Sequence, residues 1–222
     1  MEISVVYSIG IRCYTEVILK RLNLVKFSSI FGSMNIKNYD NLRRCFDSFE
    51  VLFDPQHLVY TRDVEAMSEL NAKHGFRTLH RLFDDVTDYH SSTIAHHDLS
   101  NEDHKAHFDR GLKRLEYIKA NKVPILFVSI SHDPEFKNDF HDQALIDSMK
   151  TCGFNMKVLS IYCDRHTRDP PECVYNDGTH IVYRIPSVAG FYIDGGDTDI
   201  NDEVIRDILN KHFTFAIKEI PL

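Results

Sequence analysis

A continuous apolar run in the second half of the chain constrains the fold more than any other feature. Residues 123–130 read V-P-I-L-F-V-S-I, which is typical of a strand buried on both faces of a sheet. Residues 100–121, directly before this run, place apolar side chains at helical spacing, and residues 139–151 after it end near Gly153, which suits a helix C-terminus. The same alternation continues with expected strands over 156–162 and 180–185 and a last helix over 202–213.

This alternation predicts an α/β fold with a largely parallel central sheet flanked by helices. Parallel strands need crossover connections, and helices are the usual crossovers. No stretch has the composition of a linker, so we expect residues 1–222 to form a single domain. Residues 35–99 lack the alternation, and we expect them to form a helical insertion that includes a helix over 39–49.

Composition and charge narrow the classes of function. The 222 residues carry a formal net charge of -7, which argues against nucleic acid or an anionic membrane as the main partner. No apolar run approaches the ~18 residues of a membrane span, and the N-terminus lacks the features of a secretory signal. The five cysteines are an odd number without a C-x-x-C pair, which suits free thiols in a reducing compartment. We therefore expect a cytoplasmic location.

No cofactor and no metal are expected from the motifs. The chain has no glycine-rich nucleotide motif and no H-E-x-x-H zinc motif. His104 and His107 lie one turn apart on an expected helix, but the sequence supplies no third ligand for them.

The N-terminal residues combine a strand, a turn and a cysteine at the start of a helix. Residues 3–9 are rich in β-branched and aromatic side chains, Gly10 permits a tight turn, and residues 15–24 have an apolar helical face. Cys13 thus lies near a helix N-terminus, beside Arg12. Both the helix dipole and the Arg charge favour the thiolate. The alternative is a packed, inert thiol, since free cysteine is among the most buried residue types.

Polar residues follow three of the expected strands. The segments are 10–13 (G-I-R-C), 131–133 (S-H-D) and 163–166 (C-D-R-H). In an open α/β sheet, ligands bind beyond the carboxyl ends of the parallel strands. The sheet would therefore bring a thiol, two histidines and two carboxylates to one edge. The alternative is that these are ordinary polar loops.

A further histidine cluster occupies residues 89–98, which read Y-H-S-S-T-I-A-H-H-D. A histidine near a cysteine acts as a general base, and a carboxylate holds its tautomer. Asp98 is a poor partner for His97, because neighbouring side chains diverge. The alternative is a surface loop that leads into the helix for which Ser100 is the expected N-cap.

Three motifs follow one another along the chain: residues 8–13 (S-I-G-I-R-C) with residues 19–24 (L-K-R-L-N-L), His97-Asp98 with residues 108–115 (F-D-R-G-L-K-R-L), and the strand over 125–129. In this order they resemble the putative papain-like cysteine peptidases, a domain family of unknown function found in bacteria and large DNA viruses. The resemblance extends over residues 3–215. It implies Cys13 as nucleophile and His97 as general base, and host cytoplasm as the location if the source is viral.

The resemblance has one departure, after the first helix. The family usually carries Pro-Phe-Asp-Trp where this chain has I-F-G-S at residues 30–33. Gly32 stands at the Asp position, so a carboxylate that would bind substrate or support catalysis is missing there. The architecture also differs, because papain-type folds place the cysteine helix against an antiparallel barrel, whereas the alternation here predicts an α/β sheet.

These observations together predict a cysteine-dependent hydrolase, peptidase-like or acyl-transferring, for a peptide or small-molecule substrate. The expected catalytic residues are Cys13, His97 (or His132 as the base) and Asp133. The expected substrate-binding residues are Gly10, Arg12, His132 and Asp164. Two alternatives remain: a sugar- or nucleotide-handling, transferase-like α/β protein in which Cys13 is merely packed, and a catalytically inactive binding protein. The sequence leaves the oligomeric state open.

Overall fold

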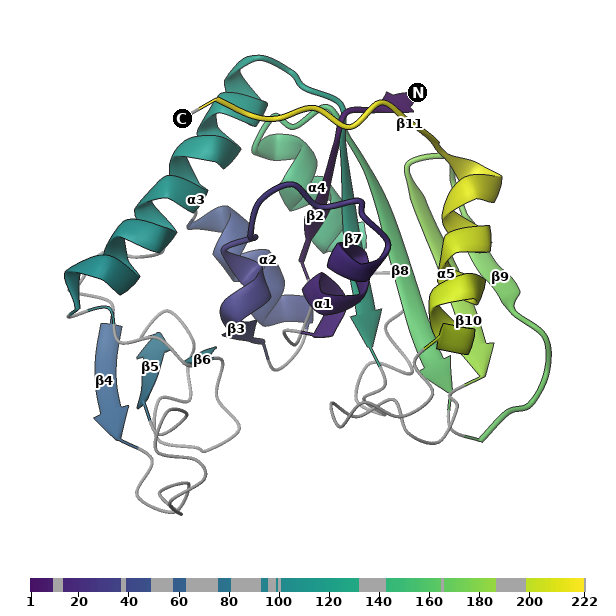
Figure 1. The fold of residues 1–222 in the computed structure, drawn as a ribbon, viewed down its shortest axis with the longest axis horizontal. Helices are drawn as coiled ribbons and strands as arrows, with labels where there is room; N and C mark the ends of the chain where they lie inside the picture. Colours follow the sequence, from purple (N-terminus) through teal and green to yellow (C-terminus); the bar gives the residue numbers. More distant parts are fainter. Residues whose placement is uncertain are drawn as a thin grey trace.

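A five-stranded sheet forms the centre of the fold (Figure 1). The computed structural model describes residues 1–9, 14–36, 39–48, 58–62, 76–80, 93–95, 99, 101–131, 143–164, 166–186 and 199–221. The strands of the central sheet, in spatial order, are β2 (Val5–Ser8), β7 (Ile125–Ser131), β8 (Met156–Asp164), β10 (His180–Pro186) and β9 (Glu172–Asn176). The first four are parallel, and β9 is an antiparallel edge strand. The predicted parallel sheet is confirmed.

Helices cover both faces of this sheet. Two of them, α1 (Tyr14–Arg21) and α5 (Asp199–His212), pack on one face. The other three pack on the opposite face: α2 (Tyr39–Asp47), α3 (Glu102–Ala120) and α4 (Gln143–Thr151). Every residue of β7 is buried, as its continuous apolar sequence predicts for a strand between two helical layers.

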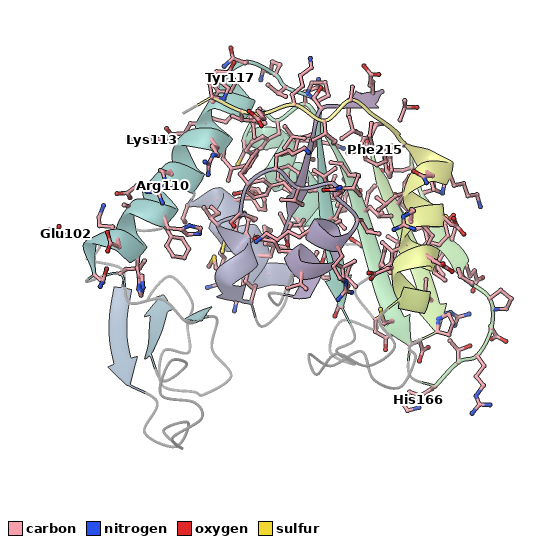
Figure 2. The ribbon with its side chains drawn as sticks, viewed as in Figure 1. Glu102, Arg110, Lys113, Tyr117, His166 and Phe215 are labelled. Carbon is pink, nitrogen blue, oxygen red and sulfur yellow. The ribbon has the colours of Figure 1, made fainter. Side chains whose placement is uncertain are left out.

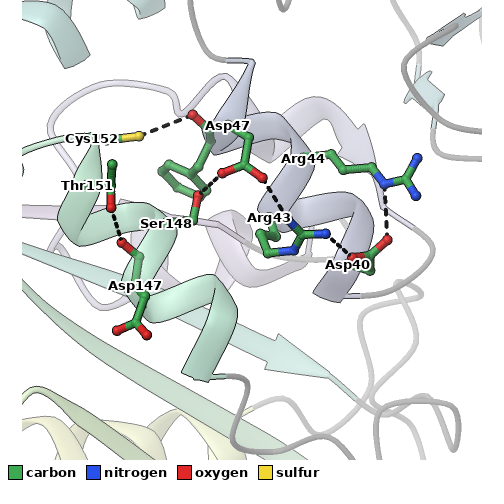
Figure 3. Close-up of polar contacts among 9 residues, drawn as sticks. Asp40, Arg43, Arg44, Asp47, Asp147, Ser148, Thr151 and Cys152 are labelled. Atoms are coloured by element: carbon green, nitrogen blue, oxygen red, sulfur yellow. Dashed lines mark hydrogen bonds and ion pairs between the residues drawn. The ribbon is translucent and has the colours of Figure 1, made fainter.

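Polar contacts join α2 to α4 at the side of the sheet (Figure 3). Asp47, at the end of α2, accepts a hydrogen bond of 2.5 Å from the Ser148 hydroxyl of α4 and one of 2.8 Å from the Arg43 guanidinium of its own helix. The half-buried thiol of Cys152 donates to the backbone oxygen of Phe46 at 3.1 Å. These contacts fix the end of α2, which belongs to the insertion, to α4 of the main body of the fold.

Two helix ends were predicted from capping residues in the sequence, the C-terminus of α4 and the N-terminus of α3. Gly153 follows α4 with φ of 87°, a left-handed conformation that suits glycine, so its predicted role as a helix stop is confirmed. The N-cap of α3 is Asn101, whose side-chain oxygen accepts hydrogen bonds from the backbone of Asp103 and His104. The expected cap, Ser100, was wrong, because Asn caps as well as Ser and stands one residue closer to the helix.

The insertion is mixed rather than wholly helical. It contains α2 and a second, antiparallel sheet with the order β3 (Met34–Asn35), β6 (Thr93–Ala95), β5 (Phe76–His80) and β4 (Leu58–Arg62). The helical expectation for residues 35–99 is corrected on this point. Leu58–Arg62 reads L-V-Y-T-R, and its aromatic and β-branched side chains favour a strand once a partner is available.

Two further strand pairings lie outside the elements expected from the sequence. The polar loop after β8 contains β9, which pairs with β10 at the edge of the sheet. The N-terminal β1 (Glu2–Ile3) pairs in parallel with β11 (Thr214–Phe215), so these two short strands lie side by side (Figure 1). Among the described residues, none of the helices combines the length and the apolar character needed to cross a membrane.

Candidate functional site

The parallel strands end together at one edge of the central sheet. Ser131 of β7 is level with Tyr162 of β8, and Asp164 of β8 is level with Pro186 of β10. This is the edge at which ligands bind in open α/β folds. The residues that follow the strand ends in the sequence include most of the predicted site.

Of the predicted site residues, the structure describes Asp164. The other six lie outside the described residues: Gly10, Arg12, Cys13, His97, His132 and Asp133. The geometry of the candidate site is therefore built from the described residues on either side of them.

Asp164 is a buried carboxylate at the carboxyl end of β8, with 4% of its surface exposed. Its Oδ1 atom accepts a hydrogen bond of 2.8 Å from the backbone N–H of His166. The exposed His166 lies at the lower edge of the molecule, beyond the sheet (Figure 2). The prediction that Asp164 lies at this edge is confirmed, and its role in binding substrate stays a prediction.

The first turn of α1 is bonded to the end of β7. The buried hydroxyl of Thr15 accepts a hydrogen bond of 3.2 Å from the N–H of Ile130 and donates one of 3.3 Å to the carbonyl of the same residue. β2 ends at Ser8, which is level with Val128, so the Thr15 hydroxyl replaces the ladder partner that β2 no longer supplies to Ile130. The start of the helix that follows Cys13 in the sequence is thereby held at the carboxyl edge.

A buried carboxylate stands next to this contact. Glu16, with 6% of its surface exposed, accepts a hydrogen bond of 2.9 Å from the backbone N–H of Ser29. It also forms an ion pair of 2.5 Å with Lys20, whose side chain is 50% exposed. Glu16 thus joins α1 to the loop that leads into the 3₁₀ helix η1 (Phe31–Ser33).

The same loop is bonded to the end of β2. The Ser29 hydroxyl donates to the carbonyl of Ser8 at 2.5 Å and accepts from the N–H of Phe31 at 3.0 Å. The Tyr7 hydroxyl accepts a hydrogen bond of 3.0 Å from the N–H of Ile30. Burial raises the pKa of Tyr7 well above its ordinary value, so the phenol stays neutral and keeps its place in this network.

Gly32 lies against Glu16. A Cβ atom at position 32 would come within 2.6 Å of Cδ of Glu16 and would overlap one of its carboxylate oxygens. The space that a side chain at position 32 would use is therefore filled by a carboxylate from α1. Residue 32 itself carries no carboxylate, and the carboxylate of Glu16 lies against it instead.

The second sheet leads back to the same segment. β3 continues directly from η1, and it pairs with β6 so that Met34 faces Ile94 and Asn35 faces Thr93. Because this pairing is antiparallel, β6 runs from the level of Asn35 toward η1. Leu99 is buried in the same apolar cluster as Ile30 and Phe31. Strand β6 precedes His97 in the sequence, and Leu99 follows it. Both therefore approach the segment Ser29–Ser33, which Glu16 bonds to α1 and the Ser29 hydroxyl bonds to β2.

The four cysteines that the structure describes are free thiols, and burial makes three of them, Cys45, Cys152 and Cys163, poor nucleophiles. Burial raises the pKa of Cys163 to about 12 and raises that of Cys45 further. Burial also raises the pKa of Cys152, while Cys173 is exposed on the edge strand β9. Within the described part of the chain, no group of three or more His, Cys, Asp or Glu side chains is arranged to hold a metal ion.

The sequence interpretation missed the residues that assemble this region. Thr15, Glu16, Ser29 and Tyr7 carry no motif, and their partners are distant in the chain. The sequence did offer one signal for the contact between Glu16 and the loop: an acidic residue in the first turn of α1 together with a glycine in the loop that follows the helix.

The comparisons with known proteins give one match. The family of putative papain-like cysteine peptidases matches residues 4–166 of the 222. This range begins at β2 and ends just after β8, so it includes the cysteine segment, the insertion and the strand end at Asp164. No similar curated protein and no similar solved structure was found.

Proposed function

Because the chain belongs to the family of putative papain-like cysteine peptidases, we propose that it is a cysteine-dependent hydrolase with Cys13 as nucleophile and His97 as general base. One observation carries this proposal. The first turn of α1 is bonded to Ser29, and β6 runs toward η1, so the described residues that follow Cys13 and precede His97 in the sequence converge on the segment Ser29–Ser33.

The proposed reaction is acyl transfer through a thioester. The Cys13 thiolate attacks the carbonyl carbon of the substrate, and His97, which has taken the thiol proton, gives it to the leaving amine or alkoxide. Water then attacks the thioester carbonyl and restores the thiol. The first turn of α1 supports this chemistry, since the N–H groups and the dipole of a helix N-terminus stabilise a thiolate and an oxyanion.

Residues at the carboxyl edge have supporting roles in the proposal. His132 and Asp133 follow β7, the strand to which Thr15 of α1 is bonded, so His132 is a second candidate for the base and Asp133 a candidate to orient it. Gly10 and Arg12 follow β2 in the sequence, and Asp164 is the last residue of β8; in the proposal these three residues contact a peptide or small-molecule substrate.

The pH dependence of Cys13 alkylation tests the proposal. Cys152→Ser and Cys173→Ser remove the two thiols that are not fully buried among those described, so iodoacetamide reports on Cys13 in the native state. We expect the rate to follow a pKa well below the ordinary ~8.5 of a cysteine and to lose this behaviour in His97→Ala. His132→Ala is the matched variant for the second candidate base. An ordinary profile in the parent protein refutes the proposal.

A ligand-binding role on the same edge is the second candidate. Asp164 is a buried acceptor at the end of a parallel strand, where α/β proteins bind sugars and nucleotides. Thermal-shift measurements with nucleotide sugars test it: stabilisation that Asp164→Asn removes supports this function, and the absence of any stabilisation counts against it.

A further inference from the structure

The Ser29 N–H is a buried backbone donor that needs an acceptor. In a capping box, a carboxylate three residues after a Ser reaches back to the N–H of that Ser. Position 32 is the residue that would supply this group locally, and here it is glycine. Glu16 supplies the acceptor instead, from α1, at 2.9 Å. Its carboxylate lies where the side chain of residue 32 would be.

This arrangement joins elements that a local cap would leave separate. An acid at position 32 would close the turn on itself, whereas Glu16 binds the turn to the helix start next to Cys13. The loop is also bonded to the end of β2 through Ser29 and continues through η1 into β3, the partner of β6.

The charged and titratable groups near the Glu16 carboxylate come from three elements. Lys20 belongs to its own helix, Tyr7 lies on β2, and Arg114 of α3 acts on Tyr7 while stacking over the ring of Phe27. The Lys20 side chain is half exposed, so its ion pair with Glu16 is screened by solvent. Of the two contacts of Glu16, the buried one with Ser29 is therefore the one that binds α1 to this loop.

We propose that Glu16 is a positioning residue whose carboxylate clamps the first turn of α1 to the segment Ser29–Ser33, and so sets the start of α1 relative to the end of β6. This inference rests on the proposed function, because Cys13 precedes the first of these elements and His97 follows the second. The clamp needs an acceptor oxygen at one point in space, which either position 16 or position 32 is able to provide.

Moving the carboxylate between the two positions tests the inference. The variants are Glu16→Ala, Glu16→Gln, Gly32→Asp and the exchange Glu16→Ala/Gly32→Asp, all in the Cys152→Ser/Cys173→Ser background. Lys20→Met is the matched control, since it removes the exposed ion pair with Glu16 and the exposed hydrogen bond to Ser28 and keeps the contact of Glu16 with Ser29. The readouts are the rate of Cys13 alkylation across pH and the midpoint of thermal unfolding.

We expect Glu16→Ala to slow Cys13 alkylation at pH 7 by about tenfold, as small misplacements of reacting groups do. Glu16→Gln should keep the alkylation rate of the parent protein, and the exchange should restore that rate. Lys20→Met should leave the rate unchanged. Gly32→Asp alone should lower the unfolding midpoint, because two carboxylates then compete for one space. If Glu16→Ala fails to fold, the exchange decides: a folded protein with the parent pH profile supports the clamp.

Two results would overturn the inference. One is a Glu16→Ala variant that is less stable than the parent protein but has the same pH profile of Cys13 alkylation, since Glu16 would then be merely structural. The other is an exchange variant no better than Glu16→Ala. Both differ from failure of the proposed function, which would show as an ordinary cysteine profile in the parent protein itself.

Discussion

Replacing Thr15 by Val isolates the contact that holds α1 at the carboxyl edge. Val has nearly the shape of Thr and removes the hydroxyl alone. The N–H and the carbonyl of Ile130 would both lose the partner on this side, because β2 ends before it reaches the level of Ile130. Thr15 and Ile130 are fully buried, so water does not replace the missing group.

The expected cost follows from two buried backbone groups left unpaired. Each such group costs about 1–3 kcal/mol, so Thr15→Val should lower the free energy of unfolding by about 2–6 kcal/mol. A change of 1 kcal/mol shifts the melting temperature of a domain of this size by roughly 2–4 °C. The melting temperature should therefore fall by about 4–24 °C.

Urea unfolding at 25 °C, followed by circular dichroism, measures this effect. Thr15→Ser is the matched control, because it keeps the hydroxyl and loses only a methyl group, which costs about 1 kcal/mol. Alkylation of Cys13 in the same two variants shows whether the placement of α1 matters for the thiol. A Thr15→Val protein that is less destabilised than Thr15→Ser would refute the reasoning.

Three further predictions concern other contacts of the described residues. A Cβ at Gly111 would overlap Ile30, so Gly111→Ala should lower the free energy of unfolding by about 1–3 kcal/mol. In an Ile30→Ala background the same substitution should raise it. Urea titrations of the parent protein, the two single variants and the double variant measure this coupling. Asp202→Ala removes the paired 2.7 Å hydrogen bonds that Arg21 of α1 donates to α5. The free energy of unfolding should fall by about 1 kcal/mol at low salt and by less at 1 M salt, because Arg21 is partly exposed. Equal losses at both salt concentrations would contradict this prediction. Burial lowers the pKa of His212, so the unfolded chain binds its proton first as the pH falls. Stability should therefore decline below about pH 6.5, and His212→Gln should remove that part of the decline in thermal melts.

The sequence predicted those elements whose signal is local. The apolar run of β7, the apolar stripes of the flanking helices and the glycine after α4 each act within a few residues, so periodicity and backbone preference were enough. The short strands β4, β5 and β6 were missed for the opposite reason. Each is five residues or fewer, and a strand of that length is specified by its partner rather than by its own sequence.

The tertiary structure alone decided how the candidate site is held together. Thr15 bonds to a strand 115 residues away, and Glu16 reaches a loop in which a glycine makes room for it. The sequence alone suggested a cysteine at the start of a helix, because helix periodicity is local. It showed that residue 32 carries no carboxylate, and only the fold shows that the carboxylate of Glu16 lies against this glycine, because the contacts of a side chain depend on where its atoms lie in space and not on its place in the sequence.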